Sequence, residues 1–73
     1  MQDFTFLLLN RDLEVMVRET KTLPNASAIW DTVGEMAKSA AESVARIRVL
    51  DESGDIVASM GVLSARTLFK EAA

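Results

Sequence analysis

An apolar run at residues 4–9, FTFLLL, constrains the fold most, because as a strand it would be apolar on both faces. Alternate side chains of a strand point to opposite faces, so Phe4, Phe6 and Leu8 would share one face. Leu7 and Leu9 would share the other face. A chain of 73 residues can cover one face of a sheet with a helix. Something else must then cover the second face.

The composition is that of one folded domain. The chain is 49% hydrophobic and 26% charged, with three Gly and one Pro, so we do not expect disorder. It has no Cys, which excludes disulfides and thiolate metal sites. The first residues, Met-Gln-Asp, and the short apolar run predict neither a signal peptide nor a membrane span. We therefore expect a soluble cytoplasmic protein with no membrane contact.

A first hairpin is predicted from strands over residues 4–9 and 13–19, joined by the tripeptide NRD. Asn and Asp favour a tight turn because their side chains bond nearby backbone groups. Pairing Leu9 with Glu14 separates the apolar side chains from the polar ones, and a four-residue loop would keep the same parity. The face expected to meet a helix then holds Phe4, Phe6, Leu8, Leu13, Val15 and Val17. The other face holds Thr5, Leu7, Leu9, Glu14, Met16 and Arg18.

A helix is predicted over residues 26–43, because apolar side chains recur there at helical spacing. Asn25 is the expected N-cap, and Ser27 is the rival cap. The apolar stripe consists of Ile29, Val33, Met36, Ala40 and Val44, with Trp30, Ala37 and Ala41 beside it. The core is expected to pack Ile29, Trp30, Val33 and Ala37 against Phe6, Leu8, Val15 and Ile47. Trp30 could instead be a ligand-stacking residue or a contact for a partner, although a core position is more common.

A second hairpin is predicted around the turn sequence DESG at residues 51–54. Its strands run over residues 45–50 and from 55 or 56 to 63. A type I turn with Gly54 at positive φ favours a three-residue loop with a bulge. An even-numbered loop would instead gather the apolar side chains on one face. These side chains are Ile47, Val49, Ile56, Ala58 and Met60.

The order of elements is therefore ββαββ, followed by a helical tail. Ser64 can cap a short last helix over residues 65–71, whose large apolar side chains are Leu68 and Phe69. We predict an α+β fold, a two-layer sandwich of antiparallel hairpins with one main helix on one face. The single domain spans residues 1–73, with the ββαββ unit over 4–63 and the tail over 64–73.

Two segments, LPNASAIWDTVGEMAKSAAE and RIRVLDESGDIVASMGV, resemble a family of short uncharacterised bacterial proteins. The shared pattern is a hairpin, a Leu-Pro-Asp/Asn helix start, an Ala-rich helix and a closing hairpin with an Asp-Glu-x-Gly turn. The resemblance covers residues 4–63. The chain departs from the pattern at residues 19–22, where ETKT has no acidic residue followed by glycine. The resemblance implies a ββαββ unit and lends no activity or functional residue.

No group of residues supports catalysis, so we predict that the protein is not an enzyme and has no cofactor or metal. The chain has no His, Cys or Tyr, which excludes nucleophile–His pairs and His-ligated metals. The three glycines stand apart and form no phosphate loop. Asp51, Glu52 and Asp55 could form a carboxylate pair or a weak calcium site. They are more simply turn residues, since the loop lacks the ligand series of an EF-hand.

The face left uncovered by the helix predicts an interaction module that forms a homodimer. The candidate interface residues are Leu7, Leu9, Met16 and Leu50, with Leu68 and Phe69 of the tail assisting or covering the face alone. The contact could use sheet faces or paired edge strands. The identity of any other protein partner does not follow from the sequence.

An alternative is a small regulatory or antitoxin-like protein that contacts nucleic acid through Arg46 and Arg48, with Arg18 on the same face. Nucleic acid is not the expected partner. The net charge is −3, and no aromatic side chains are expected beside these arginines to stack on bases. Solvated arginines, some paired with Glu14, are the simpler interpretation.

Overall fold

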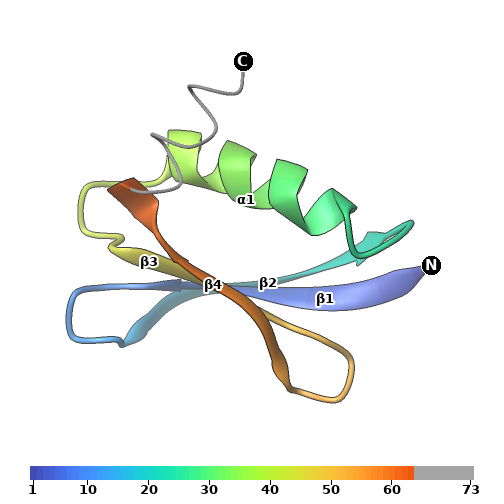
Figure 1. The fold of residues 1–73 in the computed structure, drawn as a ribbon. Helices are drawn as coiled ribbons and strands as arrows, with labels where there is room; N and C mark the ends of the chain where they lie inside the picture. The colour runs from blue at the N-terminus through green and yellow to red at the C-terminus, as the bar shows by residue number, and fades with distance from the viewer. Residues whose placement is uncertain (64–73) are drawn as a thin grey trace.

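The computed structural model describes residues 1–63, which form one four-stranded antiparallel sheet and a helix. The elements are β1 (Gln2–Leu9), β2 (Val15–Leu23), α1 (Ala28–Ser39), β3 (Arg46–Leu50) and β4 (Ile56–Gly61). The strand order is β2-β1-β3-β4, and α1 crosses one face of the sheet (Figure 1). The predicted α+β class and ββαββ order are confirmed. The predicted helical tail, with Leu68 and Phe69, lies outside the described residues.

The core lies between α1 and the two central strands, β1 and β3. Phe6, Ala37 and Val49 are fully buried there. Because β1 and β3 each have a neighbour on both sides, their helix-facing residues are shielded on every side. The core residues are Phe4, Phe6, Ile29, Val33, Ala37, Val44, Ile47, Val49 and Val62. The predicted core positions of Phe6, Ile29, Val33, Ala37 and Ile47 are confirmed.

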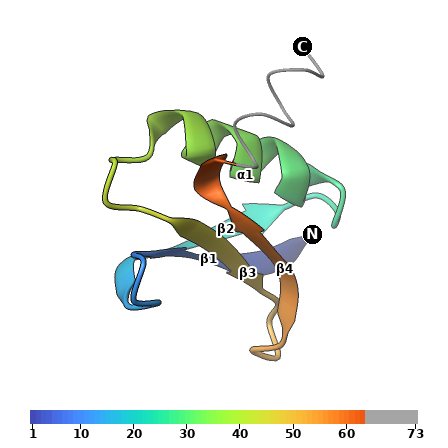
Figure 2. The same ribbon diagram turned by 60° about the vertical axis from the view of Figure 1, so that its left-hand side comes forward.

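Two expected core residues lie at the surface instead. Trp30 is 44% exposed and Val15 is 53% exposed. Trp30 follows Ile29 in the first turn of α1, about 100° around the helix from it, so it lies to the side of the stripe that meets the sheet. Val15 lies on edge strand β2, at the far edge of the sheet from β4 (Figure 2). Both predictions of burial were wrong.

Ser27, the rival cap, occupies the N-cap position, although the start of the helix is bonded by the side chain of Asn25, the expected cap. Asn25 Oδ1 accepts a hydrogen bond from Ala28 N at 3.1 Å, whereas Ser27 makes no side-chain capping bond. The helix ends at Ser39 rather than at 43, because Ala40 has an extended backbone. Leaving the helix there lets the chain return to the sheet. Val44 is buried in the core, and Ala45 N donates to Leu9 O at 2.7 Å.

The two hairpins have tips of the same design. Asn10 Oδ1 accepts hydrogen bonds from the backbone N–H groups two and four residues later, both at 2.9 Å. Asp51 Oδ1 does the same, at 2.8 and 3.0 Å. Each tip closes a three-residue loop in which the last residue has positive φ, 63° at Leu13 and 88° at Gly54. The three-residue loop predicted from the turn chemistry is therefore confirmed for the second hairpin.

Each hairpin contains a β-bulge, which lets a three-residue turn coexist with a strand pairing that keeps the apolar side chains on one face. The register shifts between Val49 and Leu50, so that Val49 pairs with Ala58 and Ile47 with Met60 on the helix side. Without the shift, the odd loop would place Ser59 opposite Ile47 and would move Ala58 and Met60 opposite Arg48 and Arg46. Ile56 is excluded from this set: it pairs with Leu50 on the other face and is 58% exposed.

The first hairpin has the equivalent shift, between Leu8 and Leu9. Leu9 pairs with Val15 and Leu8 pairs with Val17, whereas the predicted register would pair Leu9 with Glu14 and Leu8 with Val15. The predicted register was therefore wrong along the whole hairpin. The extra residue is Met16. Because the bulge restores the parity beyond it, Phe6 and Phe4 still face α1, as predicted.

Leu13 is the one non-glycine residue among 1–63 with positive φ, and it predicts a stabilising substitution. A left-handed backbone destabilises the folded state by roughly 1–2 kcal/mol at a non-glycine residue, and glycine removes this strain. Glycine also raises the conformational entropy of the unfolded chain, which offsets about 0.4–1 kcal/mol of the gain. Leu13→Gly should therefore stabilise the fold by about 0.5–1 kcal/mol and raise Tm by a few degrees in thermal unfolding. Its side chain is 57% exposed, so little burial is lost.

Gly54→Ala is the matched control for this prediction. A Cβ at Gly54 would meet nothing within 4 Å, so the change isolates the backbone cost of the same loop position. We expect Gly54→Ala to lower Tm. A lower Tm for Leu13→Gly would show that the Leu13 side chain stabilises the tip more than its backbone strain costs.

Candidate interaction surfaces

The open face is the side of the sheet away from α1. It holds Thr5, Leu7, Leu9, Val15, Arg18, Thr20, Arg46, Arg48, Leu50, Ile56 and Ser59. Leu7 is the direct cross-strand partner of Arg18 on one side and of Arg48 on the other. Three side chains therefore lie abreast, with the leucine between two arginines.

Leu7 and Leu9 are already buried within the chain, although no second layer of described residues covers the open face. Leu7 is 9% exposed and Leu9 is 1% exposed. Long arginine stems cover apolar surface while their charged ends stay in water. Arg48 Nε is buried without a hydrogen-bond partner, and Arg46 Nη1 donates to Ser59 Oγ across β4 at 3.1 Å. We infer that arginine stems lie along the sheet and shield the leucines.

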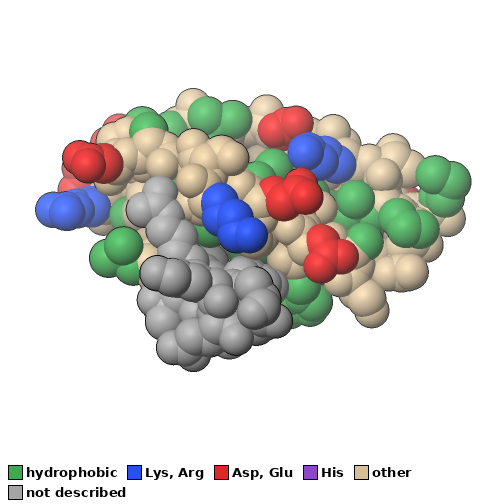
Figure 3. All heavy atoms as spheres, turned by 90° about the horizontal axis from the view of Figure 1, so that it is seen from above, with side chains coloured by type: hydrophobic (Ala, Val, Ile, Leu, Met, Phe, Trp, Pro, Cys, Tyr) green, Lys and Arg blue, Asp and Glu red, His purple; other side chains and the backbone are tan. Residues whose placement is uncertain are grey.

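The open face also carries arginines without carboxylate partners. Within residues 1–63, the ion pair that the structure contains joins Lys21 Nζ to Glu19 Oε1 at 3.6 Å. Arg18, Arg46 and Arg48 make no ion pair there, and the expected pairing with Glu14 is not found: Glu14 Oε1 accepts from Asn10 Nδ2 instead. The helix side differs, since acidic and basic side chains are interspersed on it (Figure 3).

The outer edge of β2 is the longest exposed strand edge of the sheet. Val15, Met16 and Val17 are 53%, 45% and 45% exposed, and the strand has nine residues against six in the opposite edge strand β4. Of the predicted interface residues, Met16 lies on this edge. Leu50 is half-buried on the open face, beside exposed Ile56. The exposed apolar side chains of the sheet thus lie on its edge strands, at Val15, Met16 and Val17 of β2 and at Ile56 and Val57 of β4, rather than at Leu7 and Leu9.

Backbone hydrogen bonds determine which residues of β2 face outward. The backbone N–H of Asn10 points toward β2, since it donates to the carbonyl of Glu14. The carbonyl of Leu9 points the other way, toward β3, since it accepts from the N–H of Ala45. The backbone groups of successive residues in a strand point alternately to its two neighbours. Phe4 and Phe6 of β1 therefore form backbone hydrogen bonds with their β2 partners, Lys21 and Glu19. The intervening residues Arg18, Thr20 and Thr22 therefore direct their N–H and C=O groups away from β1, toward solvent.

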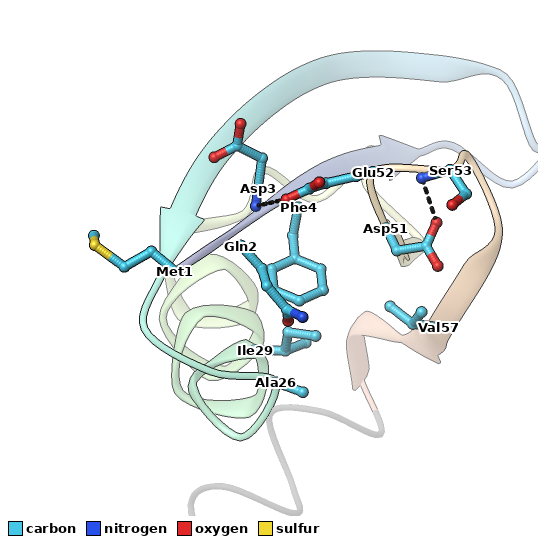
Figure 4. Close-up of a pocket in the computed structure, with 10 residues that line it drawn as sticks. All are labelled: Met1, Gln2, Asp3, Phe4, Ala26, Ile29, Asp51, Glu52, Ser53 and Val57. Carbon is cyan, nitrogen blue, oxygen red and sulfur yellow. Dashed lines mark hydrogen bonds between the residues drawn. The ribbon is translucent and has the colours of Figure 1, made fainter.

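A hollow of about 530 Å³ lies between the start of β1, the start of α1 and the tip of the second hairpin (Figure 4). Phe4, Ile29 and Val57 form its apolar walls. The carboxylates at its rim bind the chain's own backbone: Glu52 Oε1 accepts from Asp3 N at 3.0 Å, and Asp51 Oδ1 accepts from Ser53 N. Asp51 therefore bonds the backbone of its own turn, as the simpler interpretation of the loop predicted.

Three comparisons with known proteins were made, and no family model, curated protein or solved structure matches the chain. The resemblance to short bacterial ββαββ proteins therefore stays a prediction. Among residues 1–63 there is no cluster of three His, Cys, Asp or Glu side chains that could hold a metal ion. In the same part of the chain, no helix is long and apolar enough to cross a membrane.

The sequence reasoning missed Val17, Glu19 and Lys21 as surface residues of an exposed strand edge. Their strand was expected to pair with β1, which it does, but the sequence does not say which strand lies at the edge. One signal was present: residues 18–22 of VMVRETKTL are all polar or charged, which is typical of a strand that is solvated on both faces.

Proposed function

We propose that this protein is a non-enzymatic interaction module that self-associates through the outer edge of β2. The exposed edge with three consecutive apolar side chains, Val15, Met16 and Val17, is the observation that carries this proposal. A long unpaired strand edge readily adds another strand, because its free N–H and C=O groups need partners.

The edge is favoured over the open face for two reasons. Leu7 and Leu9 have almost no surface left to bury against a second copy. A face-to-face dimer would also stack the unpaired arginines of one copy, Arg18, Arg46 and Arg48, near those of the other, and like charges in contact oppose association. The β2 edge carries both signs of charge, at Glu19 and Lys21.

The mass of the protein in solution tests this function. We expect light scattering to give a dimer at about 100 μM, a concentration that reveals even weak dimers. Thr20→Pro should give a folded monomer, because it removes a backbone donor that points to solvent and leaves the pairing with β1 intact. Thr20→Ala, which keeps the donor, should remain dimeric. A monomeric parent at this concentration would overturn the proposal.

A second candidate function is binding of a polyanion such as nucleic acid on the open face. The observation in its favour is the set of three arginines without carboxylate partners, Arg18, Arg46 and Arg48. A gel shift at low salt that weakens steeply with ionic strength and is lost in an Arg46→Ala, Arg48→Ala variant would support it. Self-association through β2 predicts no shift for either protein.

A further inference from the structure

We propose that two copies pair β2 with β2 in antiparallel order about a twofold axis at Thr20, so that Glu19 of each copy lies opposite Lys21 of the other. This pairing rests on the proposed self-association and specifies its register. It would join two four-stranded sheets into one eight-stranded sheet. Because the twofold axis of such a pair is perpendicular to the sheet, both α1 helices would lie on the same side.

The backbone restricts the register first. Arg18, Thr20 and Thr22 direct their N–H and C=O groups outward, so each of these residues must face another of them in the second copy. The twofold axis can then pass only beside a single residue of β2. In the middle of the exposed stretch these centres are Arg18, Glu19, Thr20 and Lys21.

Charge selects among these four centres. Centring on Arg18, Glu19 or Lys21 places that charged residue directly opposite its own copy, and like charges opposite one another destabilise a sheet. Centring on Thr20 instead places Glu19 opposite Lys21 twice. Within one chain these two side chains already form an ion pair at 3.6 Å, with 53% and 39% of their side chains exposed. The pairing would bring the two ion pairs together in a cluster of four charges, in which each charge has a neighbour of opposite sign along its own strand and another across the interface.

The register centred on Thr20 pairs residues 17–23 of the two copies, so Val15 and Met16 lie beyond the paired stretch. The neighbouring positions within that stretch are compatible with the register. Val17, which is 45% exposed, would lie opposite the half-buried Leu23 of the second copy. Arg18 would lie opposite Thr22, whose hydroxyl donates to the Asp3 carboxylate on the next strand. An arginine that has no carboxylate partner among residues 1–63 would thereby gain an acidic neighbour.

Charge reversal tests the register. Glu19→Lys and Lys21→Glu would each place four like charges in one cluster at the interface. We therefore expect the dissociation constant of each variant's homodimer to exceed that of the parent by a factor on the order of ten or more. An equimolar mixture of the two variants should form a heterodimer of near-parent affinity, because every cross-strand pair is then opposite in sign. The double variant should also regain the homodimer. Sedimentation velocity at low salt measures all four.

Lys38→Glu is the matched control, since it makes the same charge change on α1 and should leave the dimer intact. Circular dichroism shows whether each variant is folded. If the parent is dimeric but the single reversals dimerise as tightly as it does, or the mixture fails to associate, the register is wrong while self-association stands. A monomeric parent overturns both the register and the proposed function.

Discussion

Phe6→Ala is expected to leave most of the protein unfolded at room temperature. Phe6 has no exposed surface and lies on β1 between Glu19 of β2 and Val49 of β3, facing α1. Truncating a buried phenylalanine costs roughly 3–5 kcal/mol, through lost burial and the cavity left behind. Small domains have a total stability of about 5–15 kcal/mol, and this chain is at the size where values are low. Urea unfolding followed by circular dichroism measures the loss.

Trp30→Ala serves as the control for that loss, since it removes a larger side chain from α1. Because Trp30 is 44% exposed, we expect it to cost clearly less than Phe6→Ala. If Phe6→Ala melts within a few degrees of the parent, or Trp30→Ala is the more damaging change, the packing of α1 on β1 is not the one described above.

Leu9→Lys is expected to abolish cooperative unfolding altogether. Leu9 is 1% exposed on the open face, with Val15 and Arg46 as its cross-strand neighbours. An ammonium group placed there loses its hydration without an acidic partner and lies near an existing cation, a combination that costs several kcal/mol. The change would therefore report on folding rather than on a dimer interface. Thermal unfolding and one-dimensional NMR measure the outcome.

Ile56→Lys makes the same chemical change on the same face, at a side chain that is 58% exposed. We expect it to change stability by less than about 1 kcal/mol. A stable, folded Leu9→Lys protein would mean that Leu9 is accessible, and it would return the open face to consideration as a contact surface.

Much of the fold could be predicted because its signals are local. The turn sequences NRD and DESG, the helical spacing from Ile29 to Ala40, and the alternation in RIRVL each depend on a few neighbouring residues. The parity of both hairpins was harder, because turn chemistry and side-chain segregation pointed to different loop lengths. The structure satisfies both with one extra residue in the strand that follows each tip, Met16 in the first hairpin and Val57 in the second. The sequence of one short strand does not indicate that extra residue.

The candidate site could not be predicted, because it depends on which strands lie at the edges. The chain alone does not show that β1 pairs with β3 and leaves β2 outermost. Without that order, Leu7 and Leu9 are two exposed leucines in need of a partner. With it, Arg18 and Arg48 flank Leu7, and the apolar surface moves to Val15, Met16 and Val17.

The matched hairpin tips have a consequence for the route by which the chain folds. Each hairpin closes a three-residue loop with its own Asn or Asp, so each can form by itself within microseconds. Joining them requires β1 to find β3, pairing Thr5 with Leu50 from opposite ends of the described chain, and such distant pairings are slow. Until that step, the FTFLLL strand has a bare edge. Aggregation of the protein during refolding should therefore increase with protein concentration and stop once β1 has paired with β3.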